Sequence, residues 1–334
     1  MRLSRRALLG GLAASVAAPP LLAQAPEQPV IALSIAARPI AHFEARQPEK
    51  TRFGQLVFRG GLAMSGSHPR FGGLSGLWRS SDGGELVAVT DNGFWLTARP
   101  HYEEGRIAGL EAAQLAPILG SSGRPLHRSR YYDTESLAIA DGVAYLGVER
   151  THDILRFDWA KEGVGARAKP LALPRELKSL PSNRGLEALA VIPRSHRLAG
   201  ALIAISERSG AEDAPTLGAI IAGREPGLLQ IRRHDGFDIT DCAFLPNGDL
   251  LLLERWFKPL RGVGMRIRRI PGATIQKGAL LDGSFLIEAD LGQEIDNMEG
   301  ICLHQSGGKT VLTLVSDDNF SFLQRNLLLE FELV

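Results

Sequence analysis

Short, nearly continuous apolar runs alternate with turns along most of the chain. The runs Leu250–Leu253 and Val311–Val315 are examples, and Asp-Gly, Asn-Gly or Pro-containing turns separate such runs. Continuous apolar runs are typical of strands that are covered on both faces. Later runs such as Arg266–Ile270 alternate apolar and charged residues, as we expect for exposed outer edges of sheets. The pattern predicts an all-β protein built from layered sheets.

One sequence motif within this pattern is repeated five times. Each copy begins with an acidic residue, or Ser in one copy, followed by a small apolar run, a turn and a β-rich run that ends in Asp or Glu. The copies run from Ser75 to Asp91, Glu135 to Glu149, Glu187 to Glu207, Asp241 to Glu254 and Glu299 to Asp317. Their starts are 60, 52, 54 and 58 residues apart. This period, with about four strand-like runs per copy, predicts a β-propeller.

Five repeats favour five four-stranded blades in a single domain over residues 53–334. The last repeat supplies three runs, ending in Asn326–Leu333, so its fourth strand has to come from Gly54–Met64 near the N-terminus. Such an exchange closes the ring and protects its edges. A sixth blade stays possible only if it is irregular, because residues 30–53 are too few for a full repeat.

The first 25 residues have the features of an export signal. Arg5-Arg6 resembles a twin-arginine motif, an apolar run from Ala7 to Ala18 follows it, and Ala23-Gln24-Ala25 offers a cleavage site. An N-terminal membrane anchor is the alternative interpretation, although the apolar run is short for a bilayer. We expect a periplasmic protein with an N-terminal extension over residues 26–52.

Charge and cysteine content narrow the classes of partner. Without the signal the chain has 35 Lys and Arg against 37 Asp and Glu, and this balance gives no reason to expect nucleic acid or a membrane surface as a partner. We expect a monomer that binds a small anionic or ester substrate. Cys242 and Cys302 are interpreted as two buried thiols, with a disulfide as the open alternative.

Equivalent positions of propeller blades converge on one axis, so the repeated acids predict a ring of carboxylates. Ca²⁺ takes about six to eight oxygen ligands in flexible geometry, which Asp, Glu and Asn can supply. His and Cys are scarce in the motifs, which argues against zinc or copper. The candidate metal ligands are Asp91, Glu135, Glu149, Glu187, Glu207, Asp241, Glu254, Glu299, Asp317 and Asn319.

Arginine follows the second acid in three copies: Glu149-Arg150, Glu207-Arg208 and Glu254-Arg255. Successive side chains of a strand point to opposite faces, so acids that face the axis turn these arginines toward a neighbouring blade or the rim. Arginine binds phosphate and carboxylate in bidentate geometry. The candidate catalytic residues are Glu187, Arg184 and Arg255. Salt bridges between blades are the alternative interpretation of the acid–arginine pairs.

Several of these motifs form a specific set when they are taken in order. They are Phe71–Leu77 with Thr90–Gly93, Asp133–Leu137 with Glu149-Arg150, Asn183–Leu189, Leu253–Arg255, Asn297–Ile301 with Ser316–Phe320, and Gln324. The set resembles the phytase-like family, described as "esterase-like activity of phytase", over roughly residues 53–333. The resemblance implies an exported β-propeller that hydrolyses esters or phosphoesters. Propeller phytases bind several Ca²⁺ ions and hold phosphate with Lys and Arg, and this chain has the same residue types.

A more distant resemblance leaves alternatives open. Calcium-dependent lactonases of the gluconolactonase type also place a Glu at the start of an inner strand, a role that Glu135, Glu187 and Glu299 could fill here. We therefore expect a Ca²⁺-dependent hydrolase of phosphoesters or other esters. The alternatives are such a lactonase and a non-catalytic propeller that binds a ligand or a protein. In a non-catalytic propeller, Trp78, Trp95, Trp256 and Phe257 could plug the channel.

Overall fold

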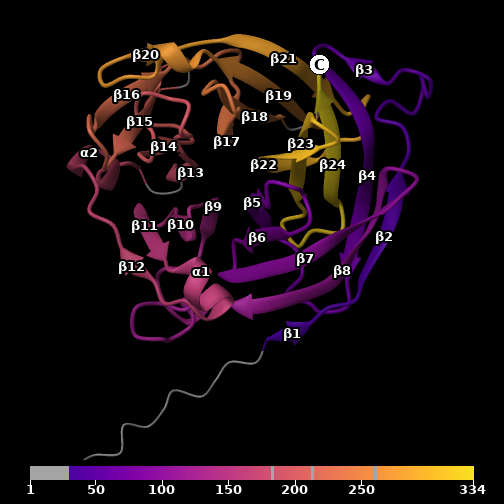
Figure 1. Ribbon diagram of the computed structural model, residues 1–334, viewed down its shortest axis with the longest axis horizontal. Coiled ribbons are helices and arrows are strands. Elements are labelled where there is room, and N and C mark those ends of the chain that lie inside the picture. The colour runs from indigo at the N-terminus through magenta and orange to yellow at the C-terminus, as the bar shows by residue number, and fades with distance from the viewer. Residues whose placement is uncertain (1–29, 182–183, 212–213, 259–261) are drawn as a thin grey trace, which may run out of the picture.

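The computed structural model describes residues 30–181, 184–211, 214–258 and 262–334. These residues form five mostly antiparallel sheets arranged in a ring (Figure 1), which confirms the predicted five-bladed propeller. The predicted signal over residues 1–25 lies outside the described residues, as does Asn183 of the predicted site.

Each blade runs outward from a strand beside the axis. Blade 1 is β5 (Leu74–Arg79), β6 (Leu86–Thr90), β7 (Phe94–Glu103) and β8 (Arg106–Pro117). Blade 2 is β9 (Thr134–Ala140), β10 (Val143–Val148), β11 (Asp153–Phe157) and β12 (Lys169–Pro170). Blade 3 is β13 (Leu186–Val191), β14 (Leu202–Ser206), β15 (Thr216–Ile221) and β16 (Gly227–Ile231), with β20 (Leu280–Leu281) added in parallel. Blade 4 is β17 (Asp238–Phe244), β18 (Leu250–Lys258), β19 (Gly262–Ile270) and β21 (Ser284–Asp290).

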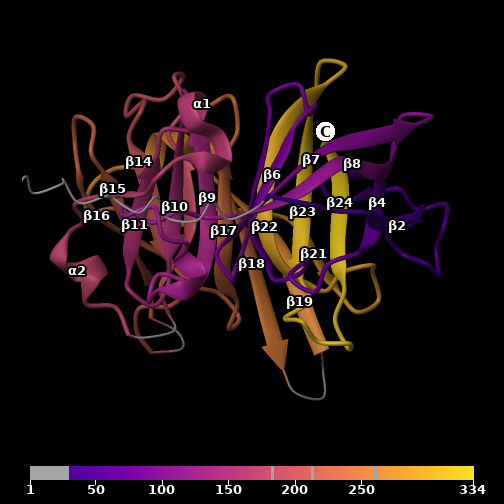
Figure 2. The same ribbon diagram turned by 90° about the horizontal axis from the view of Figure 1, so that it is seen from below.

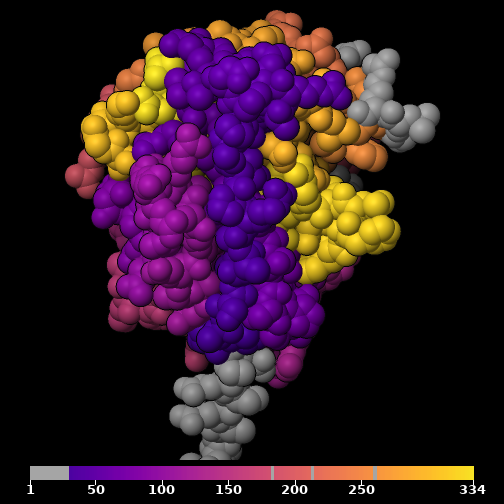
Figure 3. Space-filling model, turned by 90° about the vertical axis from the view of Figure 1, so that its right-hand side faces the viewer, coloured from indigo at the N-terminus to yellow at the C-terminus, as the bar shows by residue number. Residues whose placement is uncertain are grey.

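Blade 5 joins the two ends of the propeller. It consists of β22 (Asn297–Ser306), β23 (Lys309–Asp317), β24 (Asn326–Leu333) and the N-terminal β4 (Leu56–Gly66). The predicted closing strand is thus confirmed. Outside it, β2 (Ile35–Ile40) and β3 (Arg52–Phe53) pair with β4, and β1 (Ile31–Ala32) pairs with β8 of blade 1. These N-terminal strands cover the part of the ring's outer side that lies beside blades 1 and 5 (Figure 3).

The helices are short and peripheral. They are α1 (Trp159–Glu162), α2 (Arg175–Lys178) and the 3-10 turns η1 (Leu126–Arg128), η2 (Gly163–Gly165) and η3 (Gly272–Thr274). In the described part of the chain, no helix has the length and apolarity needed to cross a membrane.

The hydrophobic core lies between neighbouring blades. Trp95 of blade 1, for example, meets Phe157 of blade 2 edge to face, with ring centroids 5.3 Å apart. This packing explains why the inner strands are continuous apolar runs, since a neighbouring blade covers each of their faces. Both cysteines are buried and free, as predicted.

Candidate functional site

The innermost strand of every blade carries one extra residue near its start. The ladder between the two inner strands shifts register there in all five blades, as in a β-bulge. Bulges re-aim a side chain next to a site. The residues at this position are Ser75, Glu135, Glu187, Thr240 and Glu299. The three glutamates line a cavity at the axis.

The other two bulge residues tie neighbouring blades together. Ser75 donates to the carbonyl oxygen of Thr134 at 2.6 Å, and Thr240 donates to the carbonyl oxygen of Met298 at 3.1 Å. Because Thr240 occupies the bulge, the prediction that Asp241 matches the glutamates is wrong by one residue. The buried Asp241 carboxyl accepts the backbone N–H of Ile301 in the next blade at 2.8 Å. It is not among the residues that line the cavity.

The second position of the ring lies at the end of the second strand. The pairing of Val148 with Thr134 and of Glu254 with Ile239 makes Arg255, not Glu254, the counterpart of Glu149. The residues at this position are Asp91, Glu149, Glu207, Arg255 and Asp317, and all five line the cavity. The expectation that Glu254 faces the axis with the other acids is therefore wrong.

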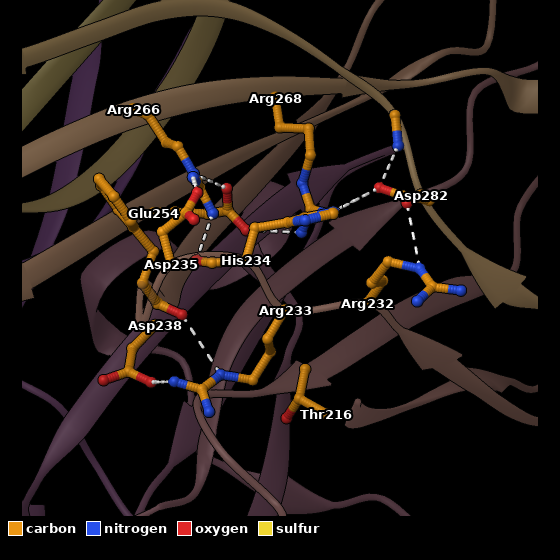
Figure 4. Close-up of polar contacts among 12 residues, drawn as sticks. Thr216, Arg232, Arg233, His234, Asp235, Asp238, Glu254, Arg266, Arg268 and Asp282 are labelled. Atoms are coloured by element: carbon orange, nitrogen blue, oxygen red, sulfur yellow. Dashed lines mark hydrogen bonds and ion pairs between the residues drawn. The ribbon is translucent and has the colours of Figure 1, made fainter. Parts of the chain in front are cut away.

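Glu254 belongs instead to a buried ion cluster in blade 4 (Figure 4). One of its oxygens lies 2.8 Å from Arg266 Nε, and the other lies 2.5 Å from Arg268 Nη2. Asp235 gives Arg266 a second carboxylate partner, and Asp282 does the same for Arg268. Both arginines are fully buried, so the expectation that Arg266–Ile270 is an exposed edge is also wrong. A cation with two carboxylate partners can be buried where an unpaired one cannot.

The cavity has a volume of about 720 Å³ and an acidic lining. Its acids among the described residues are Asp91, Asp133, Glu135, Glu149, Glu187, Glu207, Asp296, Glu299 and Asp317. Among the described residues of this lining, Arg255 is the one cationic residue. Its Nε lies 3.0 Å from Glu299 and its Nη2 lies 3.8 Å from Glu207. Burial works against the charge of Arg255, but Glu299 and Glu207 outweigh it and raise its pKa.

The crowded carboxyls hold their protons more tightly than carboxyls in water do. Burial, with repulsion from Asp317 and Asp133, raises the pKa of Asp91 to about 7. Burial also raises the pKa of Glu299 to about 7, although Arg255 opposes the shift. Glu187 is buried beside Glu135 and its pKa is raised well above the ordinary value. A cavity of this kind takes up either protons or a cation at neutral pH.

One group of carboxyls has the spacing of a cation site. Asp133, Glu135 and Glu149 each offer an oxygen, and these oxygens lie within 4.8 Å of one another. Nearby, Asp91 Oδ1 is buried and accepts no hydrogen bond from the described residues. Hard carboxylate oxygens of this kind fit Ca²⁺. Asp133 has a left-handed backbone, with a φ of +76°, and was absent from the predicted set. Its place two residues before Glu135 was the available signal.

Backbone contacts fix the loop that follows β23. The Asn319 N–H donates to Asp317 at 2.7 Å, and Asp318 accepts the Gly73 N–H at 3.0 Å. A Cβ on Gly73, whose φ is +63°, would lie 2.2 Å from Asp91 Oδ1. Only glycine therefore fits at Gly73, in the Gly-Gly pair of the first motif. Asn319 lines the cavity, as predicted for a site residue.

The three candidate catalytic residues separate in space. Glu187 and Arg255 line the cavity. Arg184 is not among the lining residues, and its Nη1 donates to the carbonyl oxygen of Gly210 at 3.3 Å. The tryptophans expected as plugs, Trp78, Trp95 and Trp256, are also absent from the lining.

Comparisons with known proteins bear on the family of this chain. The family described as "Phytase-like: Esterase-like activity of phytase" matches over residues 69–320. No curated protein matches this chain. Among solved structures, glutaminyl cyclase from Myxococcus xanthus is 13% identical over 92% of this chain and 100% of its own, with a TM-score of 0.41. The PQQ-bound aldose sugar dehydrogenase from Streptomyces coelicolor is 13% identical over 90% of this chain and 98% of its own, with a TM-score of 0.42. These low scores carry no argument about activity.

Proposed function

The chain belongs to the phytase-like family, whose model matches residues 69–320, and from this premise we propose that it is an exported hydrolase of phosphoesters or other esters. One observation carries the proposal: a polar cavity at the propeller axis combines clustered carboxyls of raised pKa with the guanidinium of Arg255. Sites that separate the pKa values of neighbouring titratable groups are typical of acid–base catalysis.

The cavity residues fit a cation of the Ca²⁺ type. Asp133, Glu135 and Glu149 would hold it, since their oxygens already lie within 4.8 Å of one another. When bound there, Ca²⁺ would supply a Lewis acid for the phosphoryl or carbonyl oxygen of the substrate and would offset the mutual repulsion of these carboxylates.

The chain's own side chains account for the remaining roles. Arg255 binds an anionic oxygen of the substrate, because it is the described cation of the lining. Burial and the neighbouring Glu135 raise the pKa of Glu187, which favours its protonated form, and Glu187 donates this proton to the leaving oxygen. Asp91, with a pKa of about 7 and an oxygen that lacks a hydrogen-bond partner among the described residues, accepts a proton from the attacking water.

An enzyme needs an open polar mouth, whereas a scaffold can fill its channel with apolar side chains. The three tryptophans near the motifs do not line the cavity, and Phe257, which does, is 65% exposed. This openness favours an enzyme over a non-catalytic binding propeller. We further propose that the protein acts in the periplasm, on the basis of the Arg5-Arg6 motif and its signal.

The test is hydrolysis of an aryl phosphate and an aryl ester by the mature protein, with Ca²⁺ and after treatment with EDTA. Glu187→Gln and Arg255→Gln are compared with Glu225→Gln, which removes an exposed carboxylate paired with Arg197. We expect turnover that requires Ca²⁺, a loss of kcat of about 100-fold in the first variant and a raised KM for the phosphate in the second. Activity that survives both chelation and Glu187→Gln contradicts the mechanism.

A further inference from the structure

Exposed apolar side chains border the mouth of the acidic cavity. Phe257, Leu291 and Leu323 line the cavity and yet are 65%, 60% and 77% exposed. We call these three residues the apolar rim. Exposed apolar groups that gather at one opening are characteristic of a binding surface. Single exposed apolar residues elsewhere on the molecule need no such explanation.

The rim comes from segments that project on one side of the ring. The ends of β18 and β19 extend beyond the other strands, on the same side as the loop between β23 and β24 (Figure 2). Leu291 packs over Gly262 so closely that a Cβ there would lie 2.2 Å from Leu291 Cδ1. The Leu323 N–H donates to Ser321 Oγ at 3.3 Å. It lies within a turn where the Ser321 N–H donates to the backbone carbonyl oxygen of Asp318 at 2.7 Å. Local contacts therefore hold Leu291 and Leu323 at the mouth.

The charge of the cavity limits what can enter beside the rim. The described lining carries nine carboxyl groups and one guanidinium, Arg255. Arg255 pairs with one anionic group, so each further phosphate group of a substrate needs a bound cation or meets the repulsion of these carboxylates. An ester with one anionic group, or with none, avoids this repulsion.

We infer that the substrate is an amphiphilic ester: its reacting end enters the cavity beside Arg255, and its apolar aryl or acyl group lies on Phe257, Leu291 and Leu323. This inference rests on the proposed function, because it assigns the substrate class of the same site. It also makes an inositol polyphosphate a poor substrate.

Binding can be tested without turnover, with two non-hydrolysable probes. Octylphosphonate and methylphosphonate are titrated calorimetrically into the Ca²⁺-loaded protein. We expect octylphosphonate to bind at least about tenfold more tightly, since each fully buried methylene contributes roughly fourfold. The double variant Phe257→Ser/Leu323→Ser should lose this difference and keep the affinity for methylphosphonate. Leu280→Ser is the matched control, because Leu280 is 43% exposed and does not line the cavity.

Turnover is then measured with p-nitrophenyl acetate, p-nitrophenyl octanoate and inositol hexakisphosphate. We expect a lower KM for the octanoate than for the acetate. In the rim variant the KM for the octanoate should rise at constant kcat. Inositol hexakisphosphate should release no phosphate. An octyl preference without any turnover supports the rim and contradicts the proposed hydrolase. Equal affinities of the two phosphonates, or no effect of the rim variant, overturn the inference about the rim. Rim-dependent binding to phospholipid vesicles with no octyl preference also overturns it and assigns the surface to a membrane.

Discussion

Glu299 predicts an unusual pH dependence for the calcium-free protein. Its carboxyl is 8% exposed, and burial together with Asp317 and Glu207 raises its pKa from 4.5 to about 7 against the opposing effect of Arg255. In the unfolded chain the same group loses its proton near pH 4.5. Between these two values the folded protein binds more protons than the unfolded chain, so the free energy of unfolding falls as the pH rises.

The magnitude follows from the size of the pKa difference. A shift from 4.5 to about 7 corresponds to about 3 kcal/mol of stability, which is fully present below pH 4.5 and lost by about pH 7. Asp91 and Asp317, whose pKa values are raised to about 7 and about 6, act in the same direction. The calcium-free protein is thus expected to be less stable at pH 8 than at pH 5.

Urea denaturation in EDTA, followed by tryptophan fluorescence at pH 5, 6, 7 and 8, measures this effect. Wild type should lose about 3 kcal/mol more than Glu299→Gln over this range, because the amide cannot ionise. Glu225→Gln, which alters an exposed carboxylate, should behave as wild type. A free energy of unfolding that is constant or rises with pH in EDTA would contradict the raised pKa of Glu299. The same would follow if Glu299→Gln lost stability with pH as steeply as wild type does.

Three further substitutions, one of them with a matched glycine control, test the placement of Gly73, Glu254 and Arg255. Gly73→Ala should lower the free energy of unfolding by about 3 kcal/mol in urea denaturation, because its Cβ meets Asp91; Gly105→Ala, also left-handed but in open space, should lose only about 1 kcal/mol. Glu254→Gln removes a carboxylate partner from two buried arginines, so the free energy of unfolding should fall by about 3–5 kcal/mol in urea denaturation. Calorimetry should find an unchanged Ca²⁺ affinity per folded molecule. Arg255→Gln removes a cation from the cavity, so calorimetry should find tighter Ca²⁺ binding and kinetics a higher KM for an anionic substrate. Equal losses of stability in the two glycine variants would contradict the described position of Gly73. A lower Ca²⁺ affinity in Glu254→Gln would contradict the position of Glu254, and weaker Ca²⁺ binding in Arg255→Gln would contradict that of Arg255.

The repeat pattern was sufficient to predict the architecture. Apolar runs, turn residues and a period near 50 residues specified the blades, because each strand has to be covered by its neighbours. The incomplete last repeat predicted the closing strand, which pairs with β24 as β4 (Leu56–Gly66). These features depend on local pattern and length, which a single sequence displays directly.

The strand register of blade 4 could not be predicted from the repeat pattern. Glu254-Arg255 looks like Glu149-Arg150 in the sequence, yet it lies one position earlier in the ladder. A bulge has no fixed sequence signature, so the shift is decided by packing between blades. Arg266, which pairs with Glu254 in the ladder, and Arg268 are spaced two apart, as on one face of a strand, and this spacing was the signal of an internal ion cluster.

Calcium titration of the EDTA-treated mature protein, by calorimetry with a parallel thermal melt, is the direct test of whether the axial carboxyls bind a cation. We expect a Ca²⁺ site whose occupancy raises the melting temperature, and whose affinity falls at least tenfold in Asp133→Asn while Glu225→Gln is unaffected. The absence of Ca²⁺ binding, or binding that Asp133→Asn leaves intact, would contradict a cation site among the axial carboxyls.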